Sequence, residues 1–308
     1  MLRFLLNRGG QALIAAFGVV TLVFFIQRLS GDPTALLLPE TATQQDIEAM
    51  RASLGLDRAL WVQYLDFLWQ MARFDLGRSF VQNASVWDII LSRLPQTLQL
   101  AAGALAVALL IGLPLGLIMA LTRGRAVSRW IMGLVLACQS MPTFWSGIMM
   151  ILVFGVWLRW LPTSGIGTLA HLVMPSVALG LLSLATYARI TRAAVVDELS
   201  RDYVRSARAR GAGTGRLVRH HLLRNSMIPI ITITALEISQ LLAGAVIVET
   251  VFAWPGLGLL TVQSIAARDF MVVQAVVLLG AFVTIGANLA ADILYSIVDP
   301  RVRLGAKS

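Results

Sequence analysis

Residues 98–121 read LQLAAGALAVALLIGLPLGLIMAL, and this stretch decides the class of fold. It carries no charged side chain, and a helix of this length crosses the roughly 30 Å hydrocarbon core of a bilayer. The chain as a whole is 57% hydrophobic and 13% charged, whereas soluble proteins carry about 25% charged residues. The sequence therefore predicts an all-α polytopic membrane protein and excludes an ordinary cytosolic enzyme.

Charge-free stretches of similar length recur along the chain. Six transmembrane helices are predicted, at residues 9–27, 98–121, 130–158, about 172–188, about 227–248 and 270–291. The first follows the basic residues Arg3 and Arg8, as a signal sequence would, but no small-x-small cleavage site ends it. We therefore interpret it as an uncleaved helix. Pro142 removes a backbone donor and predicts a bend in the third span.

The distribution of basic residues predicts the orientation. With six spans and both termini in the cytoplasm, 17 of the 25 Lys and Arg residues lie inside, as the positive-inside rule requires. Residues 250–267 are also charge-free, but a seventh span would send the basic C-terminus outward. The sequence Trp254-Pro255-Gly256 also interrupts a continuous helix. Residues 250–270 are therefore predicted to form an outer loop with a short or re-entrant helix.

A polar segment separates the first span from the others. Residues 29–95 are predicted to lie outside, with helical apolar spacing at Asp46 to Leu54 and at Leu60 to Phe74. The segment is too short for us to expect a hydrophobic core of its own, so we expect it to pack on the outer face of the spans. This divides the chain into residues 1–95 and a five-helix core at 96–308.

Residues 189–226, termed the inner hairpin, form a second polar segment between two spans. Nine arginines lie in it, and two helical stretches flank the helix-stop Gly211-Ala212-Gly213. A basic helix–turn–helix could bind nucleic acid, but tethers at both ends would keep it from a DNA groove. The remaining interpretations are contact with anionic lipid headgroups and docking of a cytoplasmic partner protein.

The sequence carries no catalytic motif. Lys307 is the only lysine and lies outside any glycine-rich loop, so there is no P-loop for ATP. One cysteine and three histidines exclude a disulfide framework and leave little for a metal site.

Uphill transport would need an ATP-hydrolysing partner or an ion gradient, and the alternative function is an ion-coupled secondary transporter using Glu237. Glu237 is the one clearly mid-span acid, and it could equally make a hydrogen-bonded contact between helices. The candidate pathway-lining residues are Gln139, Ser140, Thr143, Glu237 and Gln240.

An ordered set of motifs resembles the permease subunits of binding-protein-dependent ABC importers, and more narrowly the first permease of the dipeptide/oligopeptide/glutathione/nickel branch. The resemblance covers nearly the whole chain. The motifs are Gly31-Asp32-Pro33, Leu54-Gly55-Leu56-Asp57, Asp75-Leu76-Gly77-Arg78-Ser79, Leu161-Pro162-Thr163, Tyr203 to Gly211, Leu223 to Pro229, Glu249 to Gly258 and Asp299-Pro300-Arg301.

The resemblance implies a type I permease fold in the bacterial inner membrane and a transport subunit rather than an enzyme. It implies half of a pathway for short peptides or similar small polar solutes, with no cofactor in this chain. The implied partners are membrane lipid, a second homologous permease, two cytoplasmic ATPases that bind ATP and Mg, and a periplasmic or lipoprotein binding protein. The second permease is expected to be a different protein, which gives a heterodimer, and a homodimer is the alternative. No nucleic acid is implied. The implied ATPase-coupling residues are Ser206, Ala207, Arg208, Arg210, Gly211, Ala212, Gly213 and Thr214.

Overall fold

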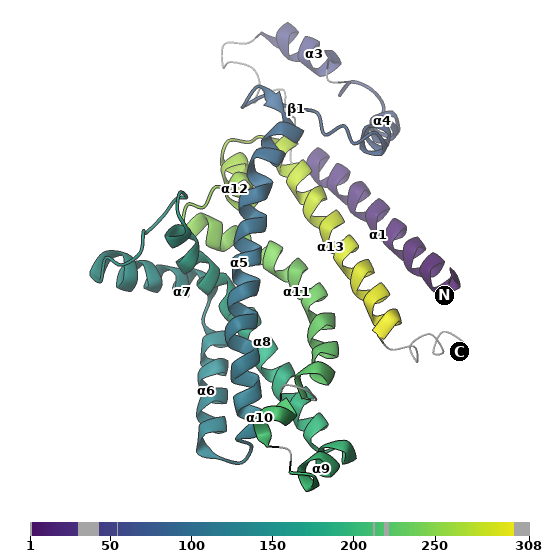
Figure 1. Ribbon diagram of the computed structural model, residues 1–308. Helices are drawn as coiled ribbons and strands as arrows, with labels where there is room; N and C mark the ends of the chain where they lie inside the picture. Colours follow the sequence, from purple (N-terminus) through teal and green to yellow (C-terminus); the bar gives the residue numbers. More distant parts are fainter. Residues whose placement is uncertain (1, 30–42, 54, 212, 219–221, 299–308) are drawn as a thin grey trace.

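The computed structural model describes residues 2–29, 43–53, 55–211, 213–218 and 222–298, which form a nearly all-helical protein (Figure 1). The helices are α1 (Leu2–Leu29), α3 (Gln44–Ser53), α4 (Leu60–Ala72), α5 (Val86–Leu121), α6 (Ala126–Ser140), α7 (Thr143–Met150), the π-helix η1 (Ile151–Trp157), α8 (Leu169–Leu199), α9 (Asp202–Ala209), α10 (Thr214–Leu217), α11 (Leu223–Val251), α12 (Leu257–Ala266) and α13 (Phe270–Val298). Two short strands, β1 (Arg78–Ser79) and β2 (Ala84–Ser85), form an antiparallel hairpin.

Among the described residues, five helices are long and apolar enough to cross a membrane, in α1, α5, α8, α11 and α13. A sixth span is formed if α6 is counted together with α7 and η1. That pair is bent by 100°. The break lies at Met141 and Pro142, where the sequence predicted a bend, because Met141 is extended (φ −79°, ψ 129°) as the residue before a proline prefers.

The fourth span is longer than the sequence predicted. We expected it over about 172–188, with the inner hairpin beginning at 189, but α8 continues without a break to Leu199. The residues after Arg189 contain no glycine or proline before Asp202, so nothing ends the helix there. The inner hairpin therefore consists of the last turns of α8, then α9 and α10, then the start of α11.

The elements divide between two ends of the molecule (Figure 1). Helices α3, α4 and α12 and the β hairpin lie at one end, which we call the outer end. Helices α9 and α10 and the turn between α5 and α6 lie at the other, inner end. The first turns of α1 and the last turns of α13 lie between these two ends, at one side of the molecule.

Close packing of α5 on α8 forms the centre of the molecule. A Cβ added at Gly116 would lie 2.5 Å from the Ala188 carbonyl oxygen and 2.6 Å from Thr191 Cβ. A Cβ added at Gly112 would lie 2.9 Å from a backbone oxygen of α8, and one at Gly180 of α8 would lie 2.7 Å from a backbone oxygen of α5. Small residues such as these let membrane helices approach one another closely.

Residues 29–95, which we call the outer segment, contain the two helices that the sequence predicted, α3 and α4. Thr43 and Asp46 cap the start of α3 reciprocally: the Thr43 hydroxyl donates to Asp46 Oδ2 (2.7 Å), and the Asp46 N–H donates to Thr43 Oγ1 (3.3 Å). The hydrogen bond from the Thr43 side chain holds the pKa of Asp46 below its usual value. The β hairpin was not predicted, because two-residue strands leave no periodic pattern.

The β hairpin is tied to the core through a buried polar contact. The Ser79 hydroxyl donates to Asp269 Oδ2 at 2.5 Å, and both residues are buried. Asp269 directly precedes α13, so this contact fixes the outer segment against the start of the last span.

Candidate functional site

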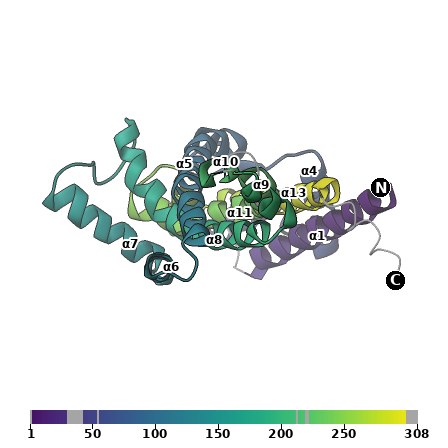
Figure 2. The same ribbon diagram turned by 60° about the horizontal axis from the view of Figure 1, so that its bottom comes forward.

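The inner hairpin lies against the inner ends of the central helices. Figure 2, which brings this end forward, shows α9 and α10 in front of α5, α8 and α11. A buried apolar cluster joins these elements. Its members are Ala120 of α5, Val195 of α8, Val204 and Ala207 of α9, Leu217 of α10, and Leu222. A force applied to α9 would therefore reach α5 and α8 through direct packing contacts.

The predicted coupling residues separate into an exposed and a buried group. The exposed members are Ser206, Arg208, Arg210, Gly211 and Gly213. Ala207 is only 6% exposed and belongs to the apolar cluster, so its role within the hairpin is to hold α9 in place. Ala212 and the side chain of Thr214 lie outside the described residues.

Local interactions fix where α9 begins and ends. The Tyr203 hydroxyl donates to the Glu198 carboxyl group at the end of α8. Gly211 has φ +83°, a conformation that favours glycine, and its N–H donates to the Arg208 carbonyl oxygen at 2.9 Å. The helix thus stops at the glycine that the sequence marked as a helix-stop.

Substituting Val204 tests whether the apolar cluster holds the hairpin. Val204→Asp places a charge in a fully buried apolar site, at a cost of about 2 kcal/mol or more. We expect α9 to open locally and trypsin to cleave at its arginines roughly tenfold faster or more in detergent-solubilised protein. Ser206→Asp adds the same charge at an exposed position and is the matched control. Equal cleavage rates for the two variants would show that the cluster does not hold α9.

A second buried site, the Glu249 cluster, lies at the outer end and comprises Thr97, Glu249, Leu257, Gly258 and Leu259. Glu249 is 0% exposed. Its Oε1 accepts from the Thr97 hydroxyl (2.7 Å), and its Oε2 accepts from the N–H groups of Gly258 (2.7 Å) and Leu259 (3.0 Å). The Leu257 N–H donates to Thr97 Oγ1 (2.8 Å). Glu249 and Thr97 together cap the N-terminus of α12 and join it to α11 and α5.

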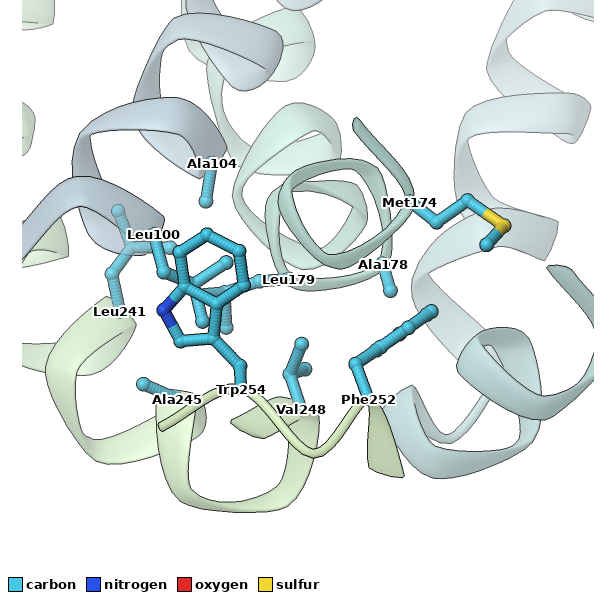
Figure 3. Close-up of a cluster of buried hydrophobic side chains, with 10 residues drawn as sticks. All are labelled: Leu100, Ala104, Met174, Ala178, Leu179, Leu241, Ala245, Val248, Phe252 and Trp254. Carbon is cyan, nitrogen blue, oxygen red and sulfur yellow. The ribbon is translucent and has the colours of Figure 1, made fainter. Parts of the chain in front are cut away.

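Trp254 anchors the same loop in the core. Its ring is 2% exposed and packs among side chains of α5, α8 and α11 (Figure 3). Its indole N–H donates to the Gln96 carbonyl oxygen at 2.9 Å. A Cβ at Gly256 would lie 2.2 Å from Glu249 Oε1, and one at Gly258 would lie 2.4 Å from Val246 Cα. Both glycines are therefore required for α12 to dock this closely.

Comparison with known proteins identifies the family. A family model described as the inner membrane component of binding-protein-dependent transport systems matches residues 112–304, and the model of its N-terminal region matches residues 1–101. The chain belongs to this family. It is a permease subunit of an ABC importer, a multi-pass inner-membrane transport component rather than an enzyme.

Three named relatives match almost the whole length of this permease. It is 38% identical over 334 residues to the di/tripeptide transport system permease protein DppB of Pseudomonas aeruginosa (strain UCBPP-PA14), and 35% identical over 336 residues to the dipeptide permease DppB of Escherichia coli K12. It is 40% identical over 304 residues to the glutathione transport system permease protein GsiC of Escherichia coli O6:H1. Each comparison covers 98% of this chain and 99% of the relative.

A solved structure supports the fold. An inward-facing structure of the MetNI methionine ABC transporter matches with a TM-score of 0.58 at 21% identity, covering 68% of this permease and 96% of that chain. At this identity the likeness shows the fold alone. It agrees with the type I importer fold that the sequence resemblance implied.

Glu237 of the permease lies between two helices. It is 4% exposed and accepts a hydrogen bond from the Ser183 hydroxyl of α8. One turn away, the Tyr187 hydroxyl donates to Thr234 Oγ1 at 2.9 Å. These contacts join α8 to α11, which is one of the two roles that the sequence left open for Glu237. The comparisons give no support to the alternative of an ion-coupled secondary transporter.

The other candidate pathway residues of the permease lie at two places. Gln139, Ser140 and Thr143 flank the break between α6 and α7, where Ser140 is exposed and the other two are half-buried. Gln240 is exposed on α11. Among the described residues, no hydrogen bond joins the α6–α7 break to Glu237 or Gln240.

Sequence reasoning missed the role of Glu249. It included this residue in the motif Glu249 to Gly258 and interpreted Trp254-Pro255-Gly256 as an interruption of a continuous helix. The available signal was an acid five residues before a tryptophan that is followed by two closely spaced glycines, which together allow a carboxyl group to approach a helix N-terminus. Within the described part of the chain, no group of three or more His, Cys, Asp or Glu residues could hold a metal ion.

Proposed function

We propose that this permease forms half of the translocation pathway for short peptides or similar small polar solutes. The support is the printed function of the relatives, which are named for di- and tripeptides, for dipeptides and for glutathione. All of these solutes carry an amide backbone and charged ends, so they need a polar path through the bilayer.

The proposal includes the partners that a binding-protein-dependent system needs. This permease pairs with a second, homologous permease. Two cytoplasmic ATPases bind ATP and Mg and supply the energy. A periplasmic or lipoprotein binding protein delivers the solute to the outer end. In this arrangement residues 1–95 supply the first span and the outward-facing segment, residues 96–308 supply the transport core, and residues 250–270 lie at the delivery face.

The inner hairpin is the proposed coupling element, and one observation carries this assignment. Its exposed side presents Arg208 and Arg210, while its buried side belongs to one apolar cluster with α5 and α8. An ATPase bound to the exposed side would therefore move the transport helices directly. The other coupling residues in the proposal are Ser206, Ala207, Gly211, Ala212, Gly213 and Thr214.

The proposed pathway-lining residues are Gln139, Ser140, Thr143, Glu237 and Gln240. An exposed amide such as that of Gln240 within an apolar span is favourable only where water or protein faces it. Gln240 is the first to test, because it is the exposed amide of α11, the helix that also carries Glu237.

Charge reversal in the inner hairpin tests the coupling assignment. We expect Arg208→Glu together with Arg210→Glu to lower ATPase co-purification and ATP-driven uptake of a labelled dipeptide by about tenfold or more, because misplaced charges at an interface cost several kcal/mol. The control is Arg125→Glu, which reverses an exposed arginine in the α5–α6 turn at the same end of the molecule.

The outcomes separate coupling from substrate. Unchanged ATPase binding and uptake in the double variant would contradict the coupling role of these arginines. The second outcome concerns proteoliposomes that contain the wild-type permease, its partners and the binding protein. If they hydrolyse ATP but take up neither dipeptide, tripeptide nor glutathione, the proposed substrate class is contradicted.

A further inference from the structure

Helix α4 presents an apolar stripe that no described part of the chain covers. Trp61, Leu65 and Trp69 are 68%, 55% and 60% exposed, and their spacing of four residues places them on one face of the helix. The opposite face carries the buried residues Gln63 and Phe67. Since soluble surfaces rarely expose large contiguous apolar patches, this stripe marks an interaction surface.

The contacts between α4 and α1 show that α4 lies at the depth of the first span. Tyr64 Oη is 2.6 Å from Thr21 Oγ1, and the ring centroids of Phe24 and Tyr64 are 5.2 Å apart. Thr21 precedes Leu29, the last residue of α1, by about 12 Å along the helix axis at 1.5 Å per residue. Helix α4 therefore lies beside the final turns of an apolar span, at the boundary between acyl chains and headgroups.

The stripe continues the lipid-exposed surface of α1. Leu22, Phe25 and Ile26 are each more than half exposed on this span, and α1 packs mainly against α13. The Phe25 ring stacks on Tyr64 with centroids 6.2 Å apart. An apolar surface therefore continues from α1 onto α4, and the lipid that surrounds α1 should also contact α4.

Charged and aromatic groups on α4 are arranged as in a helix at a membrane surface. The Arg73 guanidinium lies 4.4 Å from the Trp69 ring centroid, so a cation is held at the rim of the stripe. Tryptophans gather at the level of lipid headgroups because the ring is apolar and its N–H is polar. Asp66, on another side of the helix, is paired with Arg58 at 3.1 Å.

We propose that α4 is an interfacial helix seated in the outer leaflet of the membrane. Trp61, Leu65 and Trp69 contact the upper acyl chains, and Arg73 lies at the level of the lipid phosphates. The partner is a phospholipid surface. By this contact α4 fixes the height of α1 in the bilayer and keeps the outer segment at the membrane surface. The proposal goes beyond the transport function and does not depend on which solute is carried.

Spin-label accessibility tests this proposal on the full chain. Cys138 is the only cysteine, so Cys138→Ser gives a background for single labels at Trp61→Cys, Leu65→Cys and Trp69→Cys. These side chains are exposed, and their removal leaves the buried face of α4 intact. Leu22→Cys on α1 provides the lipid reference, and Asp66→Cys provides the matched reference on another side of α4. The permease, purified with its partner proteins, is placed in phospholipid nanodiscs.

We expect all three stripe labels to resemble Leu22→Cys, with collision rates for oxygen severalfold higher than those for a water-soluble nickel chelate, and Asp66→Cys to show the reverse. Stripe labels that resemble Asp66→Cys would overturn the proposal. Labels shielded from both reagents would also overturn it, since protein, such as the binding protein, would then cover the stripe. Leu65→Cys is the mildest of the three changes. If a tryptophan variant fails to fold, the Leu65→Cys label alone provides the test.

Discussion

Gly116→Leu is expected to prevent stable packing of α5 on α8 and to lower the Tm of the purified permease by roughly 10 °C. The Cβ atom alone would lie 2.5 Å from the Ala188 carbonyl oxygen and 2.6 Å from Thr191 Cβ. These neighbours belong to backbone and to a fully buried residue, so no side chain can turn aside to make room. Overpacking costs about 1–3 kcal/mol and more where backbones must separate, and about 3 kcal/mol corresponds to a shift of this size.

Thermal unfolding followed by size-exclusion chromatography in mild detergent measures the effect. Gly133→Leu is the matched control, because a Cβ at Gly133 of α6 meets nothing within 4 Å. Gly116→Ala should fall between wild type and Gly116→Leu. A Gly116→Leu protein as stable as the Gly133→Leu control would show that α5 and α8 do not pack at the distance described.

The positions of the six spans could be predicted from sequence because each rests on a local property, a run of apolar residues bounded by charge. The helix-stop at Gly211 and the bend at Pro142 are local in the same sense, since one residue sets the backbone conformation. The size of the bend could not be predicted. Pro142 removes one donor, but the 100° angle depends on what α7 packs against.

The non-local contacts of the site could not be predicted. Glu249 and Thr97 are 152 positions apart, and nothing in either stretch indicates that they meet. The same holds for Ala207: its sequence position marks it as part of the inner hairpin, but its burial depends on Ala120 and Val195. One sequence therefore predicts which segments matter and leaves open which side of each segment is exposed.

Glu249→Ala is expected to release α12 from the core and to abolish transport. The substitution leaves three donors without their acceptor, namely the Thr97 hydroxyl and the N–H groups of Gly258 and Leu259. Each buried donor left unpaired costs about 1–3 kcal/mol. The combined cost is about 3 kcal/mol or more. Helix α12 has only ten residues, and its first N–H groups have no acceptor within the helix, so α12 should move until water reaches these groups.

Hydrogen exchange across residues 250–269, followed by mass spectrometry of the permease in nanodiscs, reports this release. We expect the amides of α12 to exchange roughly a hundredfold faster in Glu249→Ala, since 1.4 kcal/mol corresponds to a factor of ten. Uptake by proteoliposomes containing the permease and its partners should fall to background in the same variant.

Glu249→Gln separates the acceptor role from side-chain volume. The amide fills nearly the same space but keeps one accepting oxygen in place of two, so either Thr97 or the start of α12 loses its partner. Exchange in this variant should lie between wild type and Glu249→Ala. If Glu249→Ala exchanges at the wild-type rate across α12, then Trp254 and the surrounding apolar packing alone hold the helix, and the carboxyl group is not what joins α12 to α5 and α11.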